Sequence, residues 1–345
     1  MSAPTEVTGV RLIDGDDVDA LSTVELGLAA ARDAARLKTA GNIVTGRVQV
    51  NGAVAWMRIL AGTITDLDLL GYKEFHRVGQ HVRYHVHLFR ESTGEALGIV
   101  DGRRITSLRT SATAAAAVAR WAGRRSVRVG LIGSGEEARE GLRALHGAVT
   151  VGETVVFSPT EANRAAFAAQ MGDELQLPVC AVASQREVLS ACDVLYVATS
   201  SHHEAFLHAD ELAGVGLVAA IGSTQPVHRE LFADVFVQAT RVVLDTPDAA
   251  HESGDCIEAV AAGWNRSGAI LLGDYLDGDH LDGDHLDSEF LDGDGKSQGA
   301  SGYTLFKSIG SVEQDLVLAH HLLQAAGRAD RGRQVDPIGS LRVMR

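Results

Sequence analysis

A glycine-rich turn after an apolar run is the feature of this chain best suited to chemistry. The run spans 127–132 and is followed by Gly133, Gly135 and Ala138, in the spacing G-x-G-x-x-A. In a dinucleotide-binding unit the first glycine allows a tight turn, the second lets the backbone approach a pyrophosphate, and the third small residue lets helix and strand pack closely. The helix N-terminus attracts the anion through free N–H groups and its dipole. The motif predicts a dinucleotide site.

Three basic residues are candidates for handling an anionic substrate. Arg109, in the small-residue segment 105–113, is expected between a strand end and a helix start, where it could clamp a carboxylate with two parallel hydrogen bonds. Lys73 and Arg47 come from a region rich in predicted strands. A lysine beside an arginine more readily becomes a neutral amine that can act as acid or base. The alternative is that each is an ordinary surface charge.

Small hydroxyl residues follow two later apolar runs. They are Thr199 and Ser200 after one run, and Ile221, Gly222 and Ser223 after the next. Doubly wound sheets bind ligands at the carboxyl ends of their strands, so these residues are candidates for contacting a nucleotide. The alternative is that the hydroxyl groups cap helices.

Composition narrows the class of protein. The 345 residues carry a formal net charge of −14, a balance that repels nucleic acid. We expect neither a membrane span nor a secretory signal, and the scattered cysteines are typical of reduced thiols in a cytoplasmic protein.

Adjacent histidine pairs, at 202–203 and 320–321, cannot converge on one metal, and no metal site is expected. An acidic repeat at about 273–295 reads as an exposed loop.

The predicted elements define an α/β protein. A helix is expected over 22–38, then strands over 43–50, 53–60, 84–90 and 96–100, with an Asn51-Gly52 hairpin turn. After a helix over 110–125, strands and helices alternate, which predicts a doubly wound, Rossmann-type parallel sheet. A final helix is expected over 312–326. We expect this dinucleotide-binding domain over 121–299. Residues 1–120 and 300–345 would form a discontinuous α+β domain for substrate binding and dimerisation.

Several stretches together resemble the ornithine cyclodeaminase/μ-crystallin family, over about 57–326. They include GYK at 71–73, ITSLRTSA at 105–112, LIGSGEEA at 131–138 and TLFKSIG at 304–310. The resemblance implies a homodimer, a nicotinamide cofactor and oxidoreduction at the carbon–nitrogen bond of a small amino or imino acid. By position, Arg47, Lys73 and Arg109 match the residues of the family that bind the substrate carboxylate and handle protons.

The matched stretches add further candidates. Met57 joins the substrate-binding set. The resemblance adds to the cofactor-binding set Thr110, Ser134, Glu136, Glu137, Lys307, Ser308 and Gly310.

Two departures from the family's pattern refine these expectations. Thr224 stands where the cyclodeaminases carry an aspartate, and a threonine cannot act as the base there, which favours the imine reductase and amino-acid dehydrogenase branch. The second strand of the nucleotide domain ends without an acid for a ribose hydroxyl. Ser158, Thr160 and Arg164 could instead hold a 2′-phosphate, which favours NADP over NAD. A cyclodeaminase that recycles NAD internally, and a non-catalytic cofactor-binding protein, remain alternatives.

Overall fold

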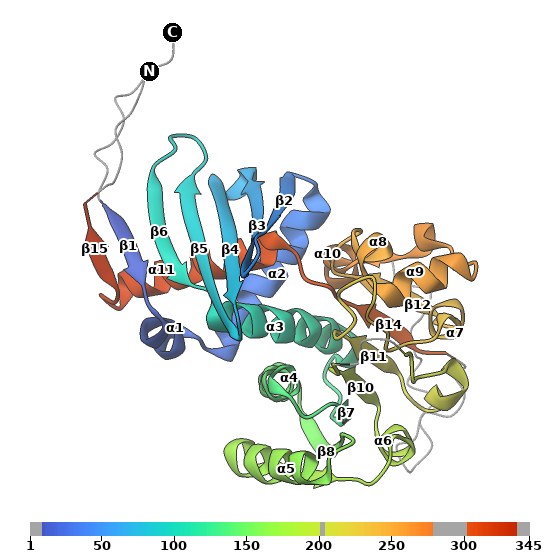
Figure 1. The fold of residues 1–345 in the computed structure, drawn as a ribbon. Helices are drawn as coiled ribbons and strands as arrows, with labels where there is room; N and C mark the ends of the chain where they lie inside the picture. The colour runs from blue at the N-terminus through green and yellow to red at the C-terminus, as the bar shows by residue number, and fades with distance from the viewer. Residues whose placement is uncertain (1–8, 201–203, 279–301, 337–345) are drawn as a thin grey trace. The chain divides into compact units, whose positions relative to one another are not determined.

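The computed structural model describes residues 9–200, 204–278 and 302–336, and the chain divides into two compact units (Figure 1). Unit 1 comprises Met1–Arg109 and Val312–Arg345, and unit 2 comprises Thr110–Ser311. The sequence instead placed the boundaries at 120/121 and 299/300. His202, His203 and most of the acidic repeat, 279–295, lie outside the described residues.

Unit 1 is built on a seven-stranded sheet of the described residues, in the order β15-β1-β6-β5-β4-β3-β2. Its strands are β1 (Val10–Ile13), β2 (Ile43–Asn51), β3 (Ala55–Ile64), β4 (Leu69–Val78), β5 (His81–Arg90), β6 (Ala96–Asp101) and β15 (Arg333–Val335). Strands β2 to β6 pair antiparallel in succession, and the predicted hairpin at Asn51-Gly52 is confirmed. Strand β4 was not predicted, because its run LLGYKEFHRV interrupts the apolar pattern with charged residues and a glycine.

Helices cover one face of this sheet. They are α1 (Gly15–Leu21), α2 (Val24–Ala40) and α11 (Val312–Arg328). A short 3-10 turn, η1 (Thr65–Leu67), connects β3 and β4. The α11 helix packs on strands β3, β4 and β5 and on α2, as Figure 1 shows. Both α2 and α11 were predicted, and their buried faces join Ile64, Leu69 and Leu88 in the core of the unit.

Helix α3 (Arg103–Ala122) begins earlier than the sequence suggested. Asp101 accepts a hydrogen bond from the Arg103 N–H (3.0 Å), which satisfies one of the free donors of the first helical turn. The hydroxyl residues of the segment 105–113 are helical and mostly buried, rather than part of a loop. The expectation that Arg109 lies between a strand end and a helix start is therefore wrong, since Arg109 lies in the second turn of α3.

Unit 2 holds an eight-stranded parallel sheet of the described residues, in the order β13-β12-β14-β11-β10-β7-β8-β9. Its elements are β7 (Val127–Ile132), α4 (Glu136–Ala148), β8 (Val151–Phe157), α5 (Glu161–Leu175), β9 (Val179–Ala181), α6 (Gln185–Ala191), β10 (Val194–Val197), η2 (Ala209–Leu212), β11 (Leu217–Ala220), α7 (Ala233–Val237), β12 (Arg241–Leu244), α8 (Ala249–Glu252), α9 (Gly254–Ala261), η3 (Arg266–Gly268), β13 (Ile270–Leu271), α10 (Leu272–Asp277) and β14 (Thr304–Lys307). The chain winds one way from β7 through β8 and β9, and the other way from β10 onward. The switch point lies between β7 and β10, where such sheets bind ligands.

Candidate active site

Lys73 lies at a junction of three elements of unit 1. From β4 it donates a hydrogen bond to Thr106 Oγ1 on α3 (2.6 Å) and pairs with Asp315 Oδ1 on α11 (2.8 Å). The residue is only 3% exposed. A lysine so deeply buried is rare unless it is paired, and this one is held at a fixed position by partners on two helices.

Arg109 reaches the same carboxylate. Its Nε lies 3.4 Å from Asp315 Oδ1, and its Nη1 donates to Gln314 Oε1 (3.3 Å). Asp315 thus holds an ammonium and a guanidinium side by side, a donor set that suits a substrate carboxylate. The structure brings Lys73 and Arg109 together as the sequence hypothesis required. The hypothesis missed Thr106 and Asp315, although both lie within or beside stretches that carried the family resemblance.

The register of the unit 1 sheet decides which other candidate residues lie on the same face of the sheet as Lys73. Arg47 on β2 pairs with Leu60 on β3, and Leu60 pairs with Lys73, so all three side chains point to one side of the sheet. Arg47 is exposed. Met57 belongs to the alternate set, because it pairs with Val50 and His76, and it points to the opposite face from Lys73. The structure therefore does not bring Met57 to the Lys73 cluster.

The glycine turn of unit 2 has the geometry that a dinucleotide requires. Gly133 has φ +114°, and a Cβ there would collide with the carbonyl oxygen of Ala198, at the end of β10. Gly135 is the N-cap of α4 without a side-chain cap, and no heavy atom lies within 4 Å of where its Cβ would be. Ala138 is fully buried where α4 packs. The backbone N–H groups of this turn and of the first turn of α4, which holds Glu136 and Glu137, are therefore candidates to bind a pyrophosphate.

The end of β8 is lined by hydroxyl and guanidinium groups. Ser134 Oγ donates to Ser158 Oγ (2.9 Å), which joins the glycine turn to this strand end. Arg164 Nη1 donates to the Ser158 carbonyl oxygen (3.0 Å), and Thr160 is the N-cap of α5. Arg139, which the sequence analysis did not single out, donates from Nη1 to the Ser134 carbonyl oxygen (2.7 Å). Two arginines thus lie beside the glycine turn.

The loops after β10 and β11 are tied together by one buried carboxylate. Glu230 accepts from the Thr199 N–H (2.9 Å) and Oγ1 (2.8 Å) with one oxygen, and from the N–H groups of Gly222 (2.9 Å) and Ser223 (3.0 Å) with the other. An ionised carboxylate satisfies all four of these donors. Burial raises the pKa of Glu230, and the positive charge of Lys307 opposes that rise. The sequence patterns assigned no role to Glu230.

A second layer of buried charge holds Glu230 in turn. Asp255 accepts from the N–H groups of Glu230 (2.8 Å) and Leu231 (3.1 Å) and pairs with Lys307 Nζ (3.2 Å). Burial opposes the charge of Lys307, but Asp255 and Glu230 outweigh it and raise the pKa of the lysine. Lys307 is fully buried in this network, so the structure gives it a role in supporting the loops.

Of the other candidates for cofactor binding, some are buried or hold loops together, and one is exposed to solvent. Asp245 accepts from Ser308 Oγ (2.7 Å) and from the Gly310 N–H (2.8 Å), which ties the loop after β14 to the end of β12. Ile221 and Thr110 are buried, whereas Ser200 is exposed beyond β10.

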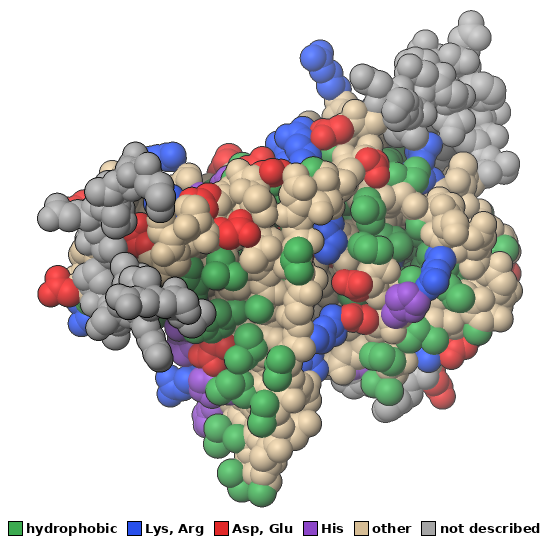
Figure 2. Space-filling view, turned by 90° about the horizontal axis from the view of Figure 1, so that it is seen from above, with side chains coloured by type: hydrophobic (Ala, Val, Ile, Leu, Met, Phe, Trp, Pro, Cys, Tyr) green, Lys and Arg blue, Asp and Glu red, His purple; other side chains and the backbone are tan. Residues whose placement is uncertain are grey.

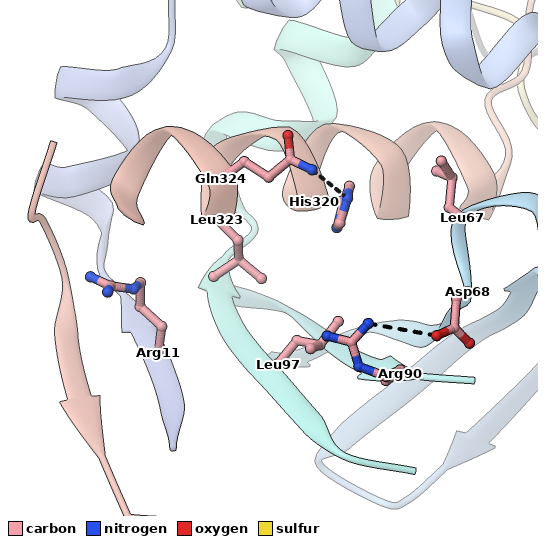
Figure 3. Close-up of a pocket in the computed structure, with 8 residues that line it drawn as sticks. All are labelled: Arg11, Leu67, Asp68, Arg90, Leu97, His320, Leu323 and Gln324. Carbon is pink, nitrogen blue, oxygen red and sulfur yellow. Dashed lines mark hydrogen bonds and ion pairs between the residues drawn. The ribbon is translucent and has the colours of Figure 1, made fainter. Parts of the chain in front are cut away.

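A separate pocket of unit 1 contains none of the predicted site residues (Figure 3). It lies between α11 and the strands and is lined by Arg11, Leu67, Asp68, Arg90, Leu97, His320, Leu323 and Gln324. Four of its polar residues form pairs within the pocket, since Arg90 Nη1 lies 3.6 Å from Asp68 Oδ2 and Gln324 donates to His320. Within the described ranges no cluster of histidine, cysteine or acidic residues could hold a metal ion. No helix in them is long and apolar enough to cross a membrane.

A parallel doubly wound sheet with this glycine turn defines a dinucleotide-binding fold, and the expected fold class is confirmed. A family model described as the ornithine cyclodeaminase/mu-crystallin family matches residues 71–327, and the chain belongs to this family. It is 26% identical over 250 residues to the delta(1)-pyrroline-2-carboxylate reductase of Bacillus cereus, with 71% of each chain covered.

Two solved structures share the fold. The iminosuccinate reductase of Paracoccus denitrificans, in complex with NAD+, superposes with a TM-score of 0.84 at 21% identity and covers 95% of this chain and 100% of its own. The Thermococcus litoralis delta(1)-pyrroline-2-carboxylate reductase, in complex with NADH and L-proline, gives a TM-score of 0.80 at 21% identity and covers 94% of this chain and 100% of its own.

Proposed function

We propose that this protein reduces the carbon–nitrogen double bond of a small imino acid with a nicotinamide cofactor, or catalyses the reverse oxidation of the amino acid. The family and the named relatives confirm the reaction class, which is oxidoreduction at an imine or amine carbon–nitrogen group. The observation that carries the proposal for this chain is the buried Lys73, held beside Arg109 by Asp315.

The residues of unit 1 suit the chemistry at nitrogen. Arg109 and Arg47 would bind the α-carboxylate, and Lys73 Nζ would deliver or accept the proton at the substrate nitrogen. Asp315 and Thr106 fix Nζ, so that little ordering is left to occur when substrate binds. When bound, the nicotinamide cofactor supplies or accepts the hydride at the imine carbon. Reduction thus adds a hydride to carbon and a proton to nitrogen.

We infer a preference for NADP(H). Strand β8 ends in Phe157-Ser158-Pro159-Thr160, with no acid to bind a ribose hydroxyl, and Arg164 lies at Ser158. The guanidinium of Arg164 and the hydroxyl of Ser158 could hold a 2′-phosphate. NADPH should therefore have a lower KM than NADH, and Arg164→Ala should raise the KM of NADPH alone.

We also propose a homodimer that buries the uncovered face of the unit 1 sheet. This face is opposite to the one that α11 covers, and Figure 2 shows hydrophobic side chains gathered in patches at the surface. Its exposed apolar residues include Val44, Val48, Val50, Met57, Leu70 and Val78. A contiguous apolar surface of this kind is typical of a subunit interface.

The test of the reaction is the loss of absorbance of NADPH, then NADH, with pyrroline and piperideine carboxylates and with α-keto acids plus amines. Loss of signal with an imine is expected. Ammonia release from ornithine or lysine without net cofactor consumption would instead establish a cyclodeaminase, against the indication of Thr224. Cofactor binding without turnover of any of these compounds would contradict the proposed reaction.

A further inference from the structure

An aromatic and cationic surface adjoins Lys73 on the same face of the unit 1 sheet. The next row of paired residues toward the β2–β3 hairpin runs Gln49, Arg58, Phe75 and Tyr84 across β2 to β5. Strand alternation places these side chains on the Lys73 side. Arg58 and Lys73 are diagonal neighbours on adjacent strands, and the Cβ atoms of such neighbours are roughly 7 Å apart. One small substrate can therefore reach both side chains.

The Arg58 guanidinium is held in a fixed position. Its Nε and Nη2 both donate to Gln49 Oε1, at 2.9 and 2.6 Å. The guanidinium carbon lies 5.6 Å from the centre of the Phe75 ring and 6.0 Å from that of Trp56. These two rings pack edge to face at 5.5 Å. Such a restrained guanidinium loses little conformational freedom when it binds an anion.

The aromatic rings extend this surface to Lys73. Phe75 stacks on Tyr84 at 5.5 Å, and the Tyr84 ring centre lies 5.6 Å from Lys73 Nζ. The rings and the guanidinium are half-buried, and therefore partly accessible. Within the part of the chain that the structure describes, Arg58 pairs with no carboxylate and its Nη1 makes no hydrogen bond. A partly desolvated guanidinium with an amide as its only hydrogen-bonding partner is suited to an anion from outside the chain.

We propose that Arg58 binds a second carboxylate of the substrate, so that the preferred substrate is a dicarboxylic imino acid. This rests on the proposed function, since it extends the same site. The α-carboxylate and the reacting nitrogen lie at Arg109 and Lys73, and the distal carboxylate accepts hydrogen bonds from Arg58 Nη1. Reduction adds a hydride to the imine carbon and a proton to nitrogen, and the distal group is unchanged. The product is an acidic amino acid.

The kinetic test compares two imines that differ only in the distal carboxylate. They form from oxaloacetate with ammonia and from pyruvate with ammonia. We expect kcat/KM of the wild type to be at least about tenfold higher for the dicarboxylic imine. Arg58→Gln should remove this preference through KM, and Arg58→Lys should restore part of it. Arg125→Gln is the matched control, because the Arg125 guanidinium also lies over an indole ring, 4.5 Å from the centre of Trp121, but belongs to unit 2.

Three outcomes would overturn the proposal. They are equal activity of the wild type on the two imines, an equal loss on both in Arg58→Gln, and a rise only in the KM of the cofactor, which would assign Arg58 to a cofactor phosphate. Isothermal titration of the protein with succinate and with butyrate tests Arg58 without turnover. Succinate should bind at least about tenfold more tightly, and Arg58→Gln should abolish the difference. If no imine is reduced, the proposed function fails, and this titration still decides whether Arg58 selects a dicarboxylate.

Discussion

At the scale of single residues, the chemistry of this protein depends on charges held by buried partners. Lys73 and Arg109 share Asp315 in unit 1, and Glu230 joins two loops of unit 2. In both places a carboxylate fixes the groups around it, so removing one partner leaves another buried polar group unsatisfied.

Replacing Lys73 with methionine should lower kcat by about 10²–10⁴-fold, because the proton at nitrogen loses its donor. Cofactor affinity should be unchanged, since the glycine turn belongs to unit 2. Steady-state kinetics and a cofactor titration measure the two effects. Lys38→Met is the control. Lys38, on α2, is also largely buried and pairs with Glu313 (3.2 Å) on α11, the helix that carries Asp315. Turnover by Lys73→Met within about threefold of the wild type would contradict the assignment.

Glu230→Gln should destabilise the protein by about 1–3 kcal/mol, because an amide nitrogen would face backbone donors. It should also weaken cofactor binding, since the loops after β10 and β11 lose their common anchor. Urea unfolding and a cofactor titration check both effects. Glu258→Gln provides the comparison, as Glu258 is exposed and pairs with Arg229 (2.9 Å). If Glu230→Gln unfolds at the same urea concentration and binds cofactor as tightly as the wild type, Glu230 does not anchor these loops.

At the scale of elements, the two glycines of the turn after β7 have different tasks. Gly133→Ala should cost about 2 kcal/mol or more, because φ is +114° and the new Cβ meets the Ala198 carbonyl. Gly135→Ala should fold normally, since nothing lies within 4 Å of its Cβ, yet bind the cofactor more weakly. Thermal unfolding and cofactor titration separate the two. Tight cofactor binding by Gly135→Ala would argue against a pyrophosphate at this turn.

The uncovered sheet face should respond to acid through His87. This ring stacks on Tyr72 at 4.5 Å, and burial lowers its pKa from the ordinary 6.5, with Glu74 opposing and His85 adding to the shift. The unfolded chain therefore binds a proton at a higher pH than the folded chain, so the free energy of unfolding falls as pH drops below about 6.5. Unfolding curves at neutral and mildly acidic pH should show a smaller loss for His87→Gln than for the wild type. An equal loss in both proteins would exclude this contribution.

At the scale of the whole molecule, the exposed apolar face predicts how subunits associate. Val48 is 59% exposed on that face, and Val48→Glu should convert a dimer to a monomer by placing a charge in the interface. Light scattering after size-exclusion chromatography measures the mass. Val237→Glu is the control, since Val237 is 57% exposed on α7 in unit 2. A wild-type monomer, or a dimer that tolerates Val48→Glu, would contradict the proposed interface.

The sequence by itself determined the features that depend on neighbouring residues. The glycine turn, the alternation of strands and helices, and the amphipathic helices α2 and α11 depend on local periodicity and backbone freedom, and all were predictable. Only tertiary structure decided what crosses long sequence distances. Asp315 reaches Lys73 from the far end of the chain, and register placed Met57 on one face and Arg58 on the other. Charged strands such as β4 carry no local signal that distinguishes them from loops, because burial by α11 gives them their environment. Lys307 likewise resembled a ligand-binding residue until packing showed it fully buried against Asp255.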